Sequence, residues 1–372
     1  MKWIDHQNAL DATIARLGAQ NEIAVDTEAD SLHSYFDKVC LVQISVPDED
    51  FIVDPLAKVD LKGFGELLAN PAITKVFHGG DYDLRILHRD FGFVVSNLVD
   101  TSICAQLLGY EGIGLAALLD RHFGLKLNKT HQRADWSMRP LTPEMLEYAA
   151  TDTHYLTRLA AKLREELTAL GRWEWAVEEF ARLENVRYRE TEDDTESWRK
   201  LKNIAALDRR SLAVVRDLYD WRDKLARKAD RPPFKILGND TMVELAKAKP
   251  ATPRDLPAVK SLSRYHAERY GRDIVQIVRA VLELPEQALP DKNEPKPWIR
   301  DKALEARIER LKKARDRFAK ELKIDPSVLA PRHILSAVAT SGNLDVPAMR
   351  EWQKKLMGEA FLAALEPERK LF

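Results

Sequence analysis

Hydrophobic and polar positions follow two different periods in the first half of the chain. An amphipathic pattern over residues 7–18 predicts a helix. Short β-branched runs with polar boundaries then predict strands at 23–25, 39–46, 51–53 and 75–77. From residue 81 onward the apolar positions recur at the helical period, which predicts helices at 83–92, 102–108 and 115–123. Strands followed by interleaved helices are typical of an α/β or α+β domain with a mixed sheet.

Helical patterns dominate the rest of the chain. A long helix should begin at residues 142–144, because Thr is a good N-cap and Pro suits the first helical position. The acidic run 190–196 and the four prolines between 284 and 297 indicate two linkers. Arg231-Pro232-Pro233 should break a helix pair between these linkers. These boundaries predict three domains, at residues 1–190, 197–284 and 290–372.

Composition narrows the class of protein. With 372 residues, 45% of them hydrophobic and 31% charged, the chain is expected to fold into two or three globular domains. Its apolar runs fall short of the roughly 18 residues that a membrane span needs, and its start lacks a signal-peptide pattern. Cys40 and Cys104 cannot build a disulfide framework. We therefore expect a cytoplasmic protein with buried free thiols and no membrane partner.

The net charge of −1 conceals an uneven distribution. Residues 1–190 carry a net charge of −10, whereas residues 197–284 alone carry +9. A basic module is the electrostatic footprint of a nucleic-acid-binding protein, although on charge alone solvated helix surfaces are the better explanation. If the module does bind nucleic acid, a fragment lacking residues 197–372 should remain active on short strands and handle large, structured nucleic acids poorly.

Carboxylates with distinctive spacing occur in three places. Asp26 and Glu28 lie two residues apart at the end of a predicted strand, so both should face the same side. Asp83 lies in the first turn of a helix, after His78 and a Gly-Gly turn where Asp81 is the expected cap. Tyr148 and Asp152 stand one helical turn apart. Each pattern is weak evidence alone; the Asp26 and Glu28 carboxylates would repel each other, and a divalent metal ion would offset that repulsion unless solvent does so.

In this order, the three patterns resemble the motifs of the Asp-Glu-Asp-Asp superfamily of 3′→5′ exonucleases, and most closely its ribonuclease D branch. Residues 31–35, 40–44 and 135–141 strengthen that resemblance. Tyr148 places the chain in the tyrosine subclass. Beyond the first linker, residues 217–223, 230–234 and 239–245 resemble an HRDC domain, a small helical nucleic-acid-binding module, and residues 299–366 resemble its diverged second copy.

The resemblance implies a ribonuclease-H-like α/β exonuclease domain, followed by all-α HRDC and HRDC-like domains. It implies two Mg²⁺ or Mn²⁺ ions, with Asp26 bridging both, Glu28 and Asp152 completing the first and Asp83 holding the second. Tyr148 would orient the attacking water. The implied substrate is RNA with a free 3′ end, such as a tRNA precursor, hydrolysed by a monomer to nucleoside 5′-monophosphates. The candidate substrate contacts are Lys129 and Arg139 for phosphate, and Tyr35, Phe36 and Trp136 for base stacking.

Alternatives remain open from the sequence. Trp136 could equally pack in the core, and Arg139 could pair with an acid. Asn128 stands where relatives often have an acid, which affects local RNA contacts at most. The whole chain could act on DNA, or could bind RNA without catalysis, although all five residues of the motif set are present.

Overall fold

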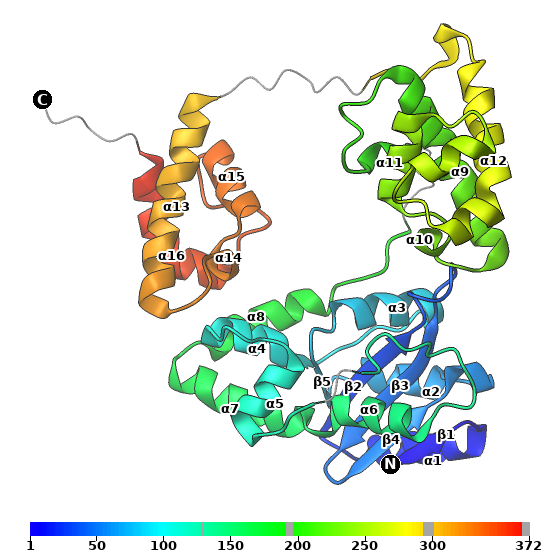
Figure 1. Cartoon of the computed structure of the whole chain (residues 1–372). Coiled ribbons are helices and arrows are strands. Elements are labelled where there is room, and N and C mark those ends of the chain that lie inside the picture. Colours follow the sequence, from blue (N-terminus) through cyan, green and yellow to red (C-terminus); the bar gives the residue numbers. More distant parts are fainter. Residues whose placement is uncertain (128–129, 191–195, 293–300, 367–372) are drawn as a thin grey trace, which may run out of the picture. The chain divides into compact units, whose positions relative to one another are not determined.

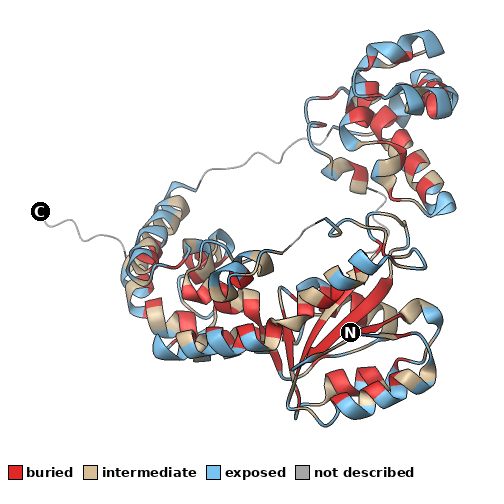
Figure 2. Cartoon of the chain, turned by 60° about the horizontal axis from the view of Figure 1, so that its bottom comes forward, coloured by how far each residue is buried: buried red, intermediate tan, exposed pale blue. Residues whose placement is uncertain are grey.

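A six-stranded mixed sheet organises the first half of the chain in the computed structural model (Figure 1). The order is β1-β4-β3-β2-β5-β6, with β3 antiparallel to both of its neighbours and the other pairs parallel. All eight residues of β3 are buried, because it lies inside the sheet with both faces covered (Figure 2). The strands are β1 Lys2–Ile4, β2 Glu22–Ala29, β3 Val39–Val46, β4 Glu49–Val53, β5 Thr74–Phe77 and β6 Leu98–Asp100.

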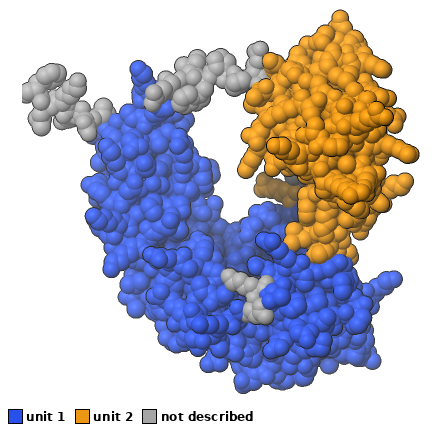
Figure 3. Space-filling view, in the orientation of Figure 1, with its two compact units in different colours: residues 1–29, 39–188, 299–372 blue, residues 30–38, 189–298 orange. Residues whose placement is uncertain are grey.

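The structure describes residues 1–127, 130–190, 196–292 and 301–366, and their contacts divide them into two units (Figure 3). The first unit contains residues 1–29 and 39–188 together with the C-terminal helices. The second unit contains residues 30–38 and the segment from 189 to 298. Each unit therefore combines segments that are separated in the sequence. The three consecutive domains expected from the sequence remain a prediction.

Helices cover the sheet of the first unit. They are α1 Gln7–Leu17, α2 Lys62–Ala69, α3 Asp81–Phe91, α4 Thr101–Leu108, α5 Leu115–Phe123, α6 Pro143–His154, α7 Leu156–Ala169 and α8 Trp173–Leu183, with a short 3₁₀ turn at Pro55–Ala57. Glycines in the left-handed conformation end α3, α4 and α5, as the sequence predicts for α3 and α5. Helix α6 begins with the predicted cap, because the Thr142 hydroxyl accepts a hydrogen bond from the Met145 amide.

The C-terminal helices share a hydrophobic core with the sheet and helices of the first half of the chain. They are α13 Lys302–Leu322, α14 Pro326–Leu329, α15 Arg332–Ser341 and α16 Glu351–Leu365. Trp352 stacks on Trp175 of α8, with ring centroids 4.8 Å apart. Arg350 forms a bidentate ion pair with Glu179 at 2.9 and 3.1 Å. These contacts attach the C-terminal helices to α8.

The second unit is a helical domain with its own core. It contains α9 Arg209–Ala229, α10 Pro233–Ile236, α11 Asn239–Ala248 and α12 Arg264–Leu282, with 3₁₀ turns at Ser197–Lys200, Pro253–Ala258 and Glu286–Ala288. Asp208 caps α9 by accepting a hydrogen bond from the Ser211 amide at 2.7 Å. Buried Arg222 donates to the Leu237 carbonyl at 2.9 Å, which fixes α9 against the following turn. The predicted helix break at residues 231–233 is confirmed.

The predicted fold class is confirmed by these elements, and the sequence missed three short ones. Strands β1 and β6 have three residues each, and α2 lies in a segment where no helix was predicted. Three residues are too few to establish a two-residue alternation, so such edge strands carry little pattern of their own. None of the described helices combines the length and apolar character needed to cross a bilayer.

Candidate active site

Two of the predicted carboxylates lie on β2, an interior strand of the sheet. Asp26 and Glu28 are opposite Gln43 and Leu41 of β3, and both are half-buried. A register shift follows directly, between Glu28 and Ala29. Such an irregularity at a strand end redirects side chains and is frequent beside active sites.

Asp83 reaches the same region from α3. The turn before this helix is fixed by Asp100, whose carboxylate accepts hydrogen bonds from the amides of Gly79 and Gly80 at 3.1 and 2.8 Å. Gly79 has a φ of +71°, which explains the glycine there. The Asp83 side chain is buried and accepts a hydrogen bond from the Thr27 hydroxyl of β2.

The expectation that Asp81 caps α3 is wrong. The N-cap residue is Gly80, and no side chain caps the helix there. Asp81 is the first helical residue and forms an ion pair with Arg85, one turn later, at 2.7 Å. An acid at this position still interacts favourably with the helix dipole, so it is stabilised without acting as a cap.

Tyr148 and Asp152 come from α6, which packs across β3 and β4. Ala149 and Ala150 are buried between them, which allows the helix to approach the sheet closely. The Asp152 carboxylate lies near the Tyr148 hydroxyl and contributes to raising the pKa of the phenol. The two side chains are one helical turn apart, on the face of α6 that points to β2.

Electrostatics confirm that the four carboxylates lie close together. Burial, followed by repulsion from Asp83, Asp152 and Glu28, raises the pKa of Asp26 well above its usual value. Burial and repulsion from Asp152 and Asp83 raise the pKa of Glu28 to about 9. Burial also raises the pKa of Asp83 to about 6 and that of Asp152 to about 7. Without a cation, the site cannot be fully ionised at neutral pH.

A cavity of about 510 Å³ opens over these side chains. Asp26, Glu28, Tyr148 and Asp152 line it, whereas Asp83 lies deeper against Thr27. Several residues that the sequence reasoning did not assign to the site also line the cavity: Thr27, His78, Leu127, Gln132 and residues 114–117 at the start of α5. The Nδ1 atom of His78 lies 2.9 Å from the Thr101 hydroxyl.

Comparisons with known proteins agree with this geometry. Residues 1–168 match the 3′-5′ exonuclease family, and residues 211–278 match the HRDC domain family. Ribonuclease D of Nitrobacter hamburgensis is 32% identical, over 95% of this chain and 92% of its own length. The chain belongs to the ribonuclease D family.

Solved structures extend the similarity over almost the whole chain. The structure of Escherichia coli RNase D, titled an exoribonuclease involved in structured RNA processing, is 27% identical with a TM-score of 0.69 and covers 98% of both chains. A protein from Bifidobacterium adolescentis is 28% identical with a TM-score of 0.82 and covers 99% of this chain and 97% of its own. This ribonuclease D family member therefore has the family's arrangement of exonuclease and helical domains.

Arg139 of this ribonuclease D family member is occupied within the protein. Its guanidinium donates to both oxygens of buried Asp54, at 2.6 and 2.7 Å. It also donates to the carbonyl groups of Cys40, Trp136 and Met138 at 2.7–2.9 Å. Of the two roles left open for Arg139, the structure shows pairing with an acid. We therefore assign no phosphate contact to this residue.

Trp136 lies in the core rather than on a surface open to bases. Its side chain is 1% exposed and packs in a cluster with Cys40 and Met145. The ring centroid lies 6.0 Å from that of Tyr148. Trp136 therefore packs in the core, as one of the two alternatives from the sequence expected. Its ring lies next to the ring of Tyr148.

Tyr35 and Phe36 belong to the helical unit, although their segment directly follows β2. The Tyr35 hydroxyl donates to Asp223 at 2.8 Å, and the amides of both residues donate to the Asp230 carboxylate at 3.0 Å. The Arg227 guanidinium lies 5.3 Å from the Tyr35 ring centroid. Tyr35 is thereby engaged in a fixed contact, whereas the Phe36 ring is 56% exposed.

Lys129, the other expected phosphate contact, lies outside the described residues. Within the described ranges, no three Asp, Glu, His or Cys side chains stand in an arrangement that could hold a metal ion as they are. The donor set nevertheless fits a hard cation, because it consists of carboxylates whose pKa values are raised by burial and by one another. Cation binding would require these side chains to move closer together.

Proposed function

We propose that this 3′→5′ exoribonuclease of the ribonuclease D family hydrolyses the terminal phosphodiester of RNA and releases nucleoside 5′-monophosphates. Asp26, Glu28, Asp83 and Asp152 would together hold two divalent metal ions, Mg²⁺ or Mn²⁺. The observation that carries this proposal is that Asp26, Glu28 and Asp152 line one cavity, while Asp83 is buried beside it and repels Asp26. Such a cluster is costly unless cations neutralise it.

Two divalent ions would stabilise the charge on the attacking and leaving oxygens of the phosphodiester. The residues of this chain supply the frame for that chemistry. Asp26 and Glu28 are anchored on an interior strand, and Asp83 is oriented by the Thr27 hydroxyl. Anchors of this kind restrict the donors to small side-chain adjustments when cations bind.

Tyr148 would orient the attacking water rather than remove its proton. Burial, together with repulsion from Asp152 and Glu28, raises the pKa of the phenol above its usual value. The phenol therefore stays protonated at neutral pH, beside the Asp152 carboxylate. Its oxygen can still accept a hydrogen bond from a water in the cavity, which fits an orienting role.

We further propose that structured RNA, such as a tRNA precursor, is the substrate. The basic charge of residues 197–284 supports this, since a net charge of +9 favours contact with a polyanion. The enzyme would act as a monomer in the cytoplasm, which sedimentation and cell fractionation would test. DNA remains the competing substrate to be measured beside RNA.

The direct experiment follows hydrolysis of end-labelled RNA and DNA oligomers with Mg²⁺, with Mn²⁺ and with a chelator. We expect metal-dependent release of nucleoside 5′-monophosphates from the RNA 3′ end. Asp81→Asn is a matched control for Asp83→Asn, because it removes an acid from the same helical turn that pairs with Arg85 instead. Turnover in the chelator, or equal loss of activity in both variants, would contradict the proposed site.

A further inference from the structure

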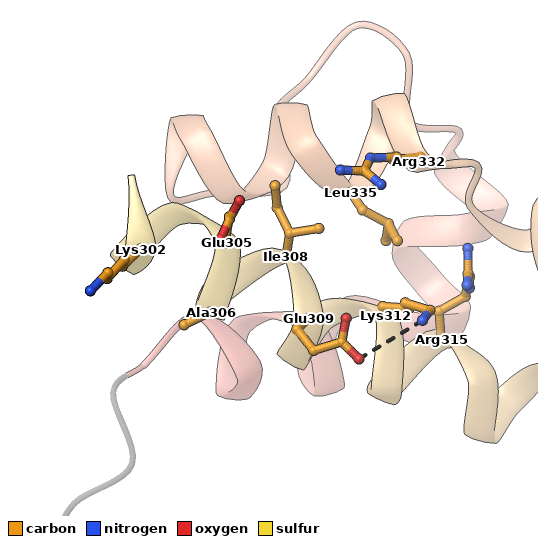
Figure 4. A pocket seen from close by; sticks show the side chains of 9 residues that line it. All are labelled: Lys302, Glu305, Ala306, Ile308, Glu309, Lys312, Arg315, Arg332 and Leu335. Carbon is orange, nitrogen blue, oxygen red and sulfur yellow. Dashed lines mark ion pairs between the residues drawn. The ribbon is translucent and has the colours of Figure 1, made fainter. Parts of the chain in front are cut away.

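Helix α13 presents two flanks of different charge to solvent. Leu311, Ala314 and Ala319 are buried, which fixes the side that faces the core. The flank toward α15 mixes acids and bases around a hollow of about 640 Å³ (Figure 4). There Lys312 forms an ion pair with Glu309 at 3.8 Å, so its charge is partly neutralised.

The flank toward α16 carries a basic stripe, consisting of Lys313, Arg317 and Lys320. These side chains lie four and three residues apart, so they follow one another along the helix surface. All three residues are exposed, and in the described part of the chain none of them forms an ion pair. The stripe therefore carries three cations without an ion pair to a described residue, and Asp316 lies one helical turn from Lys313 and Lys320.

A groove of about 890 Å³ runs beside the basic stripe. Its opposite wall is formed by Ala360, Ala363 and Ala364 of α16, whose methyl groups leave room for a bulky anion. Two acids also line the groove, and one of them, Asp316, pairs with Arg315 at 2.7 Å. The other is Glu366, so the groove keeps an excess of positive charge.

The spacing of the basic stripe suits a chain of phosphates. Neighbouring positions on one helix face lie about 5–6 Å apart, and the seven-residue step from Lys313 to Lys320 spans roughly 10 Å. A single carboxylate would engage only one of these cations, whereas successive phosphates of one strand could engage all three. Lys and Arg contacts of this kind release counterions and bind without regard to sequence.

The groove also belongs to the same unit as the active site. The Arg350–Glu179 ion pair and the Trp175–Trp352 stack attach α16 to α8. Glu178 accepts hydrogen bonds from the Glu351 and Trp352 amides at 2.7 and 3.0 Å, which fixes the first turn of α16. RNA held in the groove would thus be held on the catalytic unit itself.

We propose that the basic stripe on α13 binds the phosphate backbone of the RNA body while the 3′ end is hydrolysed. This inference rests on the proposed function, because it assigns a holding surface to that same substrate. RNA bound in this way would raise the local concentration of its 3′ end at the carboxylates. The gain should apply to long RNA and not to a trinucleotide, which cannot occupy both places.

The test compares two triple variants of the full chain. The first, Lys313→Gln with Arg317→Gln and Lys320→Gln, removes the basic stripe. The second, Lys302→Gln with Lys312→Gln and Arg332→Gln, removes the same charge from the flank that faces α15. Thermal melts would first show that both variants keep the wild-type transition.

Affinity for a tRNA precursor would then be measured over a salt series. About 0.7 counterions are released per single-strand phosphate contact, so loss of three contacts should lower the logarithmic salt slope by about 2. If wild type and the stripe variant bind equally at 1 M salt, the variant should bind roughly 100-fold more weakly than wild type at 0.1 M salt. The control should keep most of the wild-type slope, and kcat/KM for a trinucleotide should stay unchanged in both variants.

Each outcome separates the two proposals. If wild type hydrolyses the trinucleotide but the stripe variant keeps its salt slope, the groove proposal fails and the active-site proposal stands. If wild type hydrolyses no RNA with Mg²⁺ or Mn²⁺, the proposed function fails. If the salt dependence of binding weakens equally in both variants, total charge and not the basic stripe determines RNA binding. If only the stripe variant changes its sedimentation, the stripe is a self-association surface instead.

Discussion

Replacing Arg139 by Ala should destabilise the protein rather than simply weaken RNA binding. The side chain is only 25% exposed and makes two charge-assisted bonds to Asp54, which is buried. Three further bonds reach backbone carbonyls. Truncation would leave the Asp54 carboxylate without its counterion and the carbonyl groups with fewer donors.

The size of the effect follows from these contacts. Breaking a buried ion pair from one side costs about 3–5 kcal/mol, and the partial exposure of Arg139 brings the expected loss to about 3 kcal/mol. At about 2–4 °C per kcal/mol for chains of this size class, the melting temperature should fall by roughly 6–12 °C. Lys126→Ala, an exposed position in the same connecting segment, should change it by about 1 °C or less.

Thermal melts and steady-state kinetics at 20 °C would check this prediction. Arg139 also holds the Trp136 carbonyl, and the Trp136 ring packs against Tyr148. In the folded fraction of the variant, the fold decrease in kcat should therefore exceed the fold increase in KM. An unchanged melting temperature with a tenfold higher KM would show instead that Arg139 contacts the RNA, and would refute the structural reasoning.

Other perturbations probe the site directly. Asp26→Asn or Asp152→Asn should lower turnover at least about a thousand-fold in millimolar Mg²⁺, because losing a metal-binding charge costs several kcal/mol in the transition state, and circular dichroism should show an intact fold. Tyr148→Phe should lower kcat about 10- to 100-fold with little change in RNA affinity, since one hydroxyl is lost and the ring keeps its packing; a change in affinity alone would oppose the orienting role. Saturating Mg²⁺ at 100 times its Kd should stabilise the wild-type protein by about 2.7 kcal/mol, a gain that a chelator reverses and that Asp26→Asn reduces, as melting temperatures would show.

The sequence was informative wherever the determining interactions are local. Short β-branched runs, the glycine after α5 and the Thr142 cap depend on neighbouring residues, and the elements expected from them are present. The motif residues Asp26, Glu28, Tyr148 and Asp152 line one cavity, because a strand and one helical face fix their directions locally, and their roles stay a proposal. Trp136 shows the limit: a tryptophan beside polar residues fits both a stacking surface and a core, and only the packing of α6 decides.

The C-terminal helices show the same limit at the level of domains. Residues 299–366 were predicted to form a separate module, and a fragment without residues 197–372 was predicted to remain active on short strands. In the structure these helices share the core of the catalytic unit, so that fragment would expose the Trp175 ring and leave Glu179 unpaired. A deletion confined to residues 197–292 would test the helical unit more cleanly, although residues 30–38 would lose their partners.

Residues 30–38 have an evolutionary consequence. The segment is encoded between two strands of the nuclease, yet Tyr35 and Phe36 are bonded to Asp223 and Asp230 of the helical unit. A gene fusion that exchanged the helical module as one continuous stretch would leave residues 30–38 unchanged. The new module would then present different residues to that loop. Substitutions at position 35 should therefore be inherited together with substitutions at position 223, and recombinants that join the two halves from distant relatives should fold poorly until this loop is exchanged as well.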